Sequence, residues 1–226
     1  MRDIDFAAEL RLSVSEAADG TMKSAEQPNG YEGNRSRFLS QIGASEDQTV
    51  RVHISYDRDD YCRYAAVSEA DGGAGILRDV PVQDGLATDV PGLTLFLPLA
   101  DCMGTVLWDP VTTTVMLTHL GRHSVVQDGA IHSVEFLREH FDVHPEHLRA
   151  WLGPSPSGAS YPLHDRGNRS FTEEVAAQLE RVGVSRKNIV ASNILTDRDP
   201  DFFSHSEYLA GRQPTDGRHA MAVRIL

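Results

Sequence analysis

The sequence predicts a single α+β domain, spanning residues 1–226, in which helices are layered on mixed, largely antiparallel sheets in an α/β/α arrangement. A length of 226 residues with a 40% apolar share suits one large domain with a sizeable core. Two apolar runs separated by an Asp-Pro turn predict an antiparallel pair of buried strands. The remaining strand and helix patterns lack a regular β-α-β rhythm, which favours a mixed sheet over a doubly wound parallel one.

The first third of the chain contains short elements separated by turn residues. The patterns predict a strand over 8–14, a loop at 27–30, a helix from Asn34 to Ile42, and strands over Val50–Tyr56 and Tyr61–Val67. Within Val50–Tyr56 the apolar residues alternate with polar ones, and His53 lies on the polar face. The strand therefore turns His53 toward solvent or a polar cleft, and solvent is the commoner location for a lone histidine.

The stretch from Leu93 to Phe141 is the expected centre of the domain. Its first apolar run ends at Ala100-Asp101-Cys102 and continues into a second run up to the turn at Asp109-Pro110, and a third run returns to His119. The pattern brings a thiol and an imidazole to neighbouring strands of one sheet. Taken singly, Cys102 is typical of a core residue and His119 of a hydrogen-bonded histidine at a core edge.

The C-terminal part combines two helices with several short strands. The patterns predict a helix over Ser124–Phe141, a strand over Arg149–Leu152, a helix from a capping box at Ser170-x-x-Glu173 to about Val182, and strands over Lys187–Ala191 and Arg218–Leu226. The loop from Ser155 to Asn168 is long for a compact domain. Long loops often carry functional residues, so this one is a mild indication of a site.

Composition excludes some classes of function. The formal charge of -12, without clusters of Lys and Arg, argues against a partner nucleic acid. No apolar run approaches the length that crosses a bilayer, and the N-terminus lacks the pattern of a signal peptide, so we expect no membrane association and a cytoplasmic location. The two cysteines, Cys62 and Cys102, are then expected to stay reduced.

Several short motifs resemble one known family when they are taken together. Ala100-Asp101-Cys102, the turn at Asp109-Pro110 and His119-x-Gly121 resemble the signature of the laccase-domain family, also called polyphenol-oxidase-like proteins and zinc-dependent purine nucleoside phosphorylases. Further matches follow the family's order along roughly the whole chain: Val52-His53, Asp84-Gly85-Leu86-Ala87-Thr88, Leu152-Gly153-Pro154, and Phe202-Phe203-Ser204 with Gly217-Arg218.

The chain also departs from the family pattern. Where the family has His-Ala-Gly-Trp-Arg-Gly, this sequence has His119-Leu120-Gly121-Arg122-His123-Ser124, so the Trp is absent and the Arg stands one position earlier. Arg51 replaces the Gln before the first histidine of the pattern, and Ile54 replaces the Gly after it. The resemblance therefore indicates a divergent member.

The resemblance implies a zinc site and a reaction. In the family, the residues that match His53, Cys102 and His119 bind zinc and form the catalytic site, and two imidazoles with a thiolate are donors that suit zinc with a fourth place open. The implied reaction is cleavage of purine nucleosides by phosphate, with deamination of adenosine also known in the family. The implied partners are therefore a small-molecule nucleoside and phosphate.

Three further residues are candidates around this centre. A helix that begins after Gly121 would hold phosphate at its N-terminus, with Arg122 or His123 assisting, although Arg122 is equally well explained as a solvated surface charge. Asp101 either orients a ligand histidine from behind or caps backbone amides at the end of a strand. Both roles depend on the position of Asp101 next to Cys102, so the sequence does not distinguish between them.

Other classes of function remain open from the residues alone. Cys102 and His119 would also serve as the nucleophile and base of a cysteine hydrolase or deamidase. A non-catalytic relative that binds a metal or ligand is the third reading, since the motif after His119 is altered. Multicopper oxidation is disfavoured, because it needs more histidine ligands and the ten histidines here form no His-x-His pair.

Overall fold

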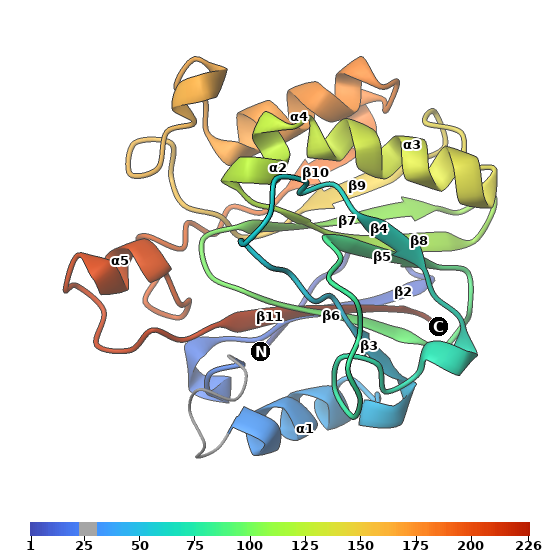
Figure 1. Cartoon of the computed structure of the whole chain (residues 1–226), viewed down its shortest axis with the longest axis horizontal. Helices are drawn as coiled ribbons and strands as arrows, with labels where there is room; N and C mark the ends of the chain where they lie inside the picture. Colours follow the sequence, from blue (N-terminus) through green and yellow to red (C-terminus); the bar gives the residue numbers. More distant parts are fainter. Residues whose placement is uncertain (23–30) are drawn as a thin grey trace.

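The computed structural model describes residues 1–22 and 31–226, and it consists of two stacked sheets with helices on both outer faces (Figure 1). The first sheet has the order β1 (Arg2–Asp3), β2 (Leu10–Val14), β11 (His219–Ile225), β6 (Thr94–Leu99), β3 (Thr49–Arg51). The second has the order β10 (Ile189–Ala191), β9 (Arg149–Leu152), β7 (Met103–Asp109), β8 (Thr114–Leu120), β5 (Gly85–Thr88), β4 (Tyr64–Ala66).

The predicted α+β class with mixed sheets is confirmed, and the helices complete a four-layer arrangement. Helix α1 (Tyr31–Gln41) covers the outer face of the first sheet, while α2 (Arg122–Val126), α3 (Gly129–Phe141) and α4 (Phe171–Arg181) cover the second (Figure 1). A short α5 (His205–Leu209) lies to one side, and single 3-10 turns occur at Ala17–Asp19, Glu46–Gln48, Glu69–Asp71, His164–Arg166 and Arg186–Asn188. No helix in the described part of the chain has the length and hydropathy that a membrane span requires.

The main core lies between the two sheets. Leu95 and Leu97 of β6 face Val106 of β7 and Leu117 of β8 in one cluster, and all four side chains are fully buried. Alternate residues of these strands point away from this layer and pack under the helices, as Phe96 does against Phe38 of α1. Burial on both faces explains why these strands are largely apolar instead of alternating between apolar and polar residues.

The predicted pair of buried strands is the β7–β8 hairpin. Its register pairs Trp108 with Val115 next to the turn and Gly104 with His119 at the open end. The Asp109 carboxylate accepts the backbone N–H of Val111 at 2.8 Å, which closes the turn. The hairpin therefore brings Cys102, just before β7, to the same end of the sheet as His119.

Two predicted elements are wrong in extent. The strand expected over Val50–Tyr56 ends at Arg51, because the His53 carbonyl accepts the N–H of Gln83 at 2.8 Å instead of continuing along β6. The strand expected over Tyr61–Val67 is reduced to β4. The predicted loop at 27–30 lies outside the described residues.

The single helix expected over Ser124–Phe141 is also wrong, since it is divided into α2 and α3. Asp128 has a left-handed backbone with a φ of 58°, which interrupts the helix between Val126 and Gly129. At Gly129, a Cβ would lie 2.8 Å from the Ser124 carbonyl oxygen, so only glycine fits this close approach. The Ser170 capping box and the strands β9, β10 and β11 are confirmed.

Candidate functional site

A cavity of about 520 Å³ opens where the hairpin ends meet the C-terminal segment. Cys102 enters it from the turn before β7, His119 from the end of β8, and Arg122 and His123 from the start of α2. The sequence-predicted residues Asp101, Cys102, His119, Arg122 and His123 thus share one cavity. Its remaining walls come from segments far apart in the chain: Ile54, Tyr56, Pro98, Leu99, Ala100, Tyr161, His205, Ser206, Leu209 and Arg218.

The thiol and the imidazole face a common space beside Gly121. A Cβ added to Gly121 would lie 3.1 Å from the Cys102 Sγ, 3.2 Å from the His119 Nε2 and 2.9 Å from the His119 Cε1. Real Cβ contacts are not this short, so the absence of a side chain at Gly121 leaves the gap in which the two groups meet. The small residue in the His-x-Gly motif therefore shapes the site directly.

Burial keeps both groups neutral near pH 7. It raises the pKa of the Cys102 thiol to about 11. It lowers the pKa of the His119 imidazole to about 4, with the positive charge of Arg58 adding to the effect. The site thus presents a protonated thiol and an uncharged imidazole, and not a thiolate–imidazolium pair.

His119 is buried without using its hydrogen-bonding capacity. Neither of its ring nitrogens has a hydrogen-bond partner within residues 1–22 and 31–226. A neutral imidazole carries one donor and one acceptor, and leaving either unpaired in the interior costs about 1–3 kcal/mol. The arrangement is typical of a group that bonds to something bound in the cavity.

Arg122 and His123 form the cationic and aromatic side of the cavity. The Arg122 guanidinium lies 4.4 Å from the centroid of the Tyr161 ring, and its Nε donates to the Tyr161 hydroxyl at 3.4 Å. No carboxylate pairs with Arg122 among the described residues. His123 stacks on Tyr61 at a centroid distance of 4.6 Å. The helix that follows Gly121 has only five residues, so the anion would be bound chiefly by Arg122 and not by a long helix dipole.

Asp101 has the structural role and not the orienting one. Its Oδ2 accepts the backbone N–H of Ser206 at 2.8 Å, and its Oδ1 accepts the Thr196 hydroxyl at 3.0 Å. These bonds tie the turn before Cys102 to the start of α5 and hold Asp101 at a φ of 70°. Both carboxylate oxygens are occupied away from His119.

His53 lies in a different place from the other predicted ligands. It lines a separate cavity of about 330 Å³ with Arg51 and residues 75–80, and its Nδ1 lies 3.1 Å from the Val80 carbonyl oxygen. Of the three expected zinc donors, the structure therefore brings together only Cys102 and His119. No group of three or more His, Cys, Asp or Glu side chains within the described ranges is placed to hold a metal ion, so these residues do not fit the expected three-donor zinc site.

Sequence reasoning missed several residues of the cavity wall. Tyr56 lies with its hydroxyl 3.7 Å from the Cys102 Sγ. Asp216 links the Nδ1 of His205, at 2.9 Å, to the guanidinium of Arg218, at 2.7 Å. The Gly217-Arg218 motif could have identified Arg218 as a site residue, and the long loop at 155–168 could have identified Tyr161. Nothing in the local sequence pattern indicates that Tyr56 lines the cavity.

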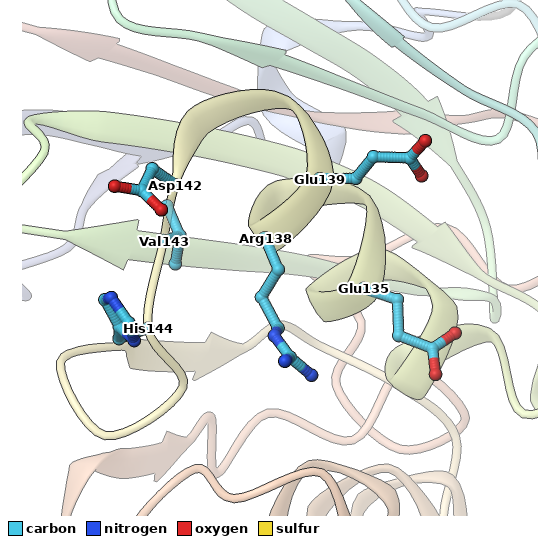
Figure 2. A pocket seen from close by; sticks show the side chains of 6 residues that line it. All are labelled: Glu135, Arg138, Glu139, Asp142, Val143 and His144. Atoms are coloured by element: carbon cyan, nitrogen blue, oxygen red, sulfur yellow. The ribbon is translucent and has the colours of Figure 1, made fainter.

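A further cavity, of about 390 Å³, lies at the end of α3 and contains none of the predicted site residues (Figure 2). Its carboxylates do not converge: Asp142 points to one side of the view, and Glu135 and Glu139 point to the other (Figure 2). Diverging charges cannot share a small ligand, so the candidate site remains the cavity at Cys102 and His119.

Comparison with known proteins identifies a family and several relatives. A family model described as multi-copper polyphenol oxidoreductase laccase matches residues 13–178. A purine nucleoside phosphorylase of Streptomyces griseus is 27% identical over 215 residues, which cover 86% of this chain and 81% of that protein. Another, from Corynebacterium glutamicum, is 25% identical over 218 residues, covering 88% and 82%.

Solved structures with low sequence identity share the fold. A hypothetical protein YfiH of Bacillus licheniformis superposes with a TM-score of 0.80 at 19% identity, covering 96% of this chain and 93% of the other. YlmD from Geobacillus stearothermophilus superposes with a TM-score of 0.79 at 19% identity, covering 98% and 94%. These two likenesses concern the fold alone.

Proposed function

The chain belongs to the family described as multi-copper polyphenol oxidoreductase laccase, and on that premise we propose that it is a purine nucleoside phosphorylase acting in the cavity at Cys102 and His119. Relatives that carry this name match most of the chain at 25–27% identity. One observation carries the proposal: an arginine without a carboxylate partner in the described structure lies in the same cavity as a buried imidazole with both nitrogens unpaired.

Arg122 is the proposed phosphate-binding group. Its guanidinium lines the cavity, is not neutralised by a described carboxylate, and is held against the Tyr161 ring. A guanidinium suits phosphate because its planar donors bond two oxygens at once, and hydrogen bonds to a charged group contribute about 1.5–3 kcal/mol each. Arg218 lies on the same wall, but Asp216 already pairs with it.

The rest of the cavity suits a nucleoside. A volume of about 520 Å³ is within the range of small-molecule sites, which are mostly apolar with a few placed polar groups. Tyr56 lines the cavity with an aromatic ring that suits contact with a purine, whereas the Tyr161 ring is already covered by Arg122 and Phe171. Asp101 also lines the cavity, but its two carboxylate oxygens accept hydrogen bonds from Thr196 and Ser206 and form none with Arg122.

In phosphorolysis a phosphate oxygen attacks C1′ of the sugar as the C1′–N9 bond breaks, and the bonding electron pair leaves with the base. His119 is placed to donate a hydrogen bond to the departing base, because it is neutral and has an unused N–H in the described structure. The cysteine-hydrolase alternative receives no electrostatic support, since a nucleophilic cysteine needs a lowered pKa and burial raises that of Cys102.

The proposal is tested by incubating the chain with inosine, or with adenosine, in the presence of phosphate and measuring free base and ribose 1-phosphate by chromatography. We expect base release that depends on phosphate, and an Arg122→Ala variant whose KM for phosphate rises about tenfold or more. Arg138→Ala, an exposed arginine on α3, is the matched control and should behave as wild type. The appearance of inosine from adenosine without phosphate would identify deamination instead, and no product from either nucleoside would refute the proposal.

A further inference from the structure

The phenol of Tyr56 joins the Cys102 thiol and the His119 imidazole at the centre of the site. The Tyr56 hydroxyl lies 3.7 Å from the Cys102 Sγ, within hydrogen-bonding distance for sulfur. Its ring meets the His119 ring edge-on, with 6.3 Å between centroids and an interplanar angle of 76°. Within the described residues, no other tyrosine hydroxyl and no imidazole nitrogen forms a hydrogen bond with this thiol.

His53 is held away from this centre by both its backbone and its side chain. Its carbonyl accepts the Gln83 N–H at 2.8 Å, and its Nδ1 lies 3.1 Å from the Val80 carbonyl oxygen. The residue before it, Val52, still donates its N–H to Phe96 of β6. Rotation of the His53 ring toward Cys102 would therefore break its contact with the Val80 carbonyl, while the bond from Gln83 fixes the His53 backbone.

The position of Tyr56 is held by the loop that carries it. The Tyr61 hydroxyl donates to the Tyr56 carbonyl at 2.9 Å, and the Tyr61 N–H donates to the Gln127 side chain at 2.9 Å. Gln127 also donates to the Asp59 carbonyl at 2.6 Å. The loop is thus fixed to the junction of α2 and α3, at the point where the predicted long helix is interrupted.

A buried ion pair provides the second anchor of this loop. The Arg58 guanidinium bonds the carboxylate of Asp84, whose side chain is 2% exposed, and its Nε donates to the Ser55 carbonyl at 3.2 Å. Asp84 also accepts the backbone N–H of Arg63 at 3.1 Å. Bonds on both sides of Tyr56 therefore hold the loop that places its hydroxyl beside the thiol.

We infer that Tyr56 takes the third position at the Cys102–His119 centre that His53 was expected to fill, so that this chain holds its thiol with a phenol and binds divalent metal weakly at this point. The inference concerns the residues of the centre and does not depend on the reaction proposed above. Zinc sites with protein ligands generally need three or four nitrogen, sulfur or carboxylate donors, and a neutral phenol is not among the usual ones.

The test measures metal binding without any assay of activity. Wild type, His53→Ala, Tyr56→Phe and Tyr56→His are freed of metal and titrated with Co²⁺, which reports thiolate coordination by its charge-transfer absorption, and with Zn²⁺ in competition. We expect wild type, His53→Ala and Tyr56→Phe to bind equally weakly, and Tyr56→His to bind at least tenfold more tightly. The new absorption should disappear in Tyr56→His/Cys102→Ser.

Three results would overturn the inference. One zinc ion per wild-type chain that is lost in His53→Ala would show that His53 is the third donor after all. A loss of affinity in Tyr56→Phe would show that the phenol itself binds metal, and an unchanged affinity in Tyr56→His would show that position 56 does not face the centre. His53 is exposed, so its alanine variant is expected to fold normally.

Discussion

Replacing Gly121 by alanine should damage the site while leaving the fold nearly intact. The added methyl would lie 3.1 Å from the Cys102 Sγ and 2.9 Å from the His119 Cε1, so the thiol and the ring must separate by several tenths of an ångström. The backbone itself accepts alanine, because Gly121 has a φ of -86° and a ψ of 177°. The perturbation therefore acts on the gap between the two side chains.

The expected magnitudes differ between stability and activity. Overpacking of this kind costs about 1–3 kcal/mol, and the reduced freedom of the unfolded chain offsets about 0.4–1 kcal/mol of it. We therefore expect the free energy of unfolding of Gly121→Ala to fall by about 1–2 kcal/mol, or a few degrees in Tm. Displacement of a reacting group by about 1 Å costs about 100-fold in rate, so a shift of several tenths of an ångström should lower kcat/KM for phosphorolysis by about one order of magnitude.

Urea unfolding and steady-state kinetics measure the two effects separately. Gly33→Ala is the matched control, since it makes the same change in α1 where the nearest atom to the new Cβ is 3.7 Å away. It should raise the free energy of unfolding by about 0.5–1 kcal/mol and leave kcat/KM unchanged. Wild-type kinetics in Gly121→Ala would refute the reasoning, as would a loss of more than about 4 kcal/mol in stability, because the gap would then be structural.

Substitutions at three further positions are tested by their effect on stability. Asp101→Ala removes the acceptor of the Thr196 hydroxyl and the Ser206 N–H, and urea unfolding should show a loss of about 2 kcal/mol, with Asp101→Asn losing less. Burial lowers the pKa of His219 from 6.5 to about 3, so the unfolded chain takes up a proton that the folded one does not. His219 should accordingly contribute a fall of about 2 kcal/mol in the free energy of unfolding from about pH 6.5 to about pH 5, and His119 adds a similar fall. A smaller total fall in His219→Phe would confirm this, whereas an identical pH profile would contradict it. Ser170→Ala should cost about 1 kcal/mol in thermal unfolding, because it removes the N-cap of α4.

Local patterns predicted the parts of the fold that depend on neighbouring residues. The β7–β8 hairpin followed from apolar runs around Asp109-Pro110, and helix α4 followed from its capping box at Ser170. Each depends on contacts within a few residues, which the order of the sequence shows directly. The break at Asp128 was missed, since it depends on the approach of Gly129 to the Ser124 carbonyl and on the loop bound to Gln127.

The candidate site likewise contains residues that the sequence predicted and one that it placed wrongly. Cys102, His119, Arg122 and His123 lie on or beside consecutive elements, so their convergence was predictable from the hairpin and the helix after it. His53 was placed by a family motif and by an alternation that continues past the true end of β3. Apolar and polar residues continue to alternate in the sequence after Arg51. The strand nevertheless ends there, because the His53 carbonyl bonds to Gln83 and no longer to β6.

The sequence by itself determined the class of fold, the hairpin, and the meeting of a thiol and an imidazole at one end of a sheet, because periodicity and turn chemistry act over short distances along the chain. Only the tertiary structure decided which third side chain joins them, since the loop with Tyr56 has no periodic pattern of its own. Its course is set by Asp84 and Gln127, which lie 26 and 66 residues from the groups they bind. Contacts of that range exist only once the sheets and helices are assembled.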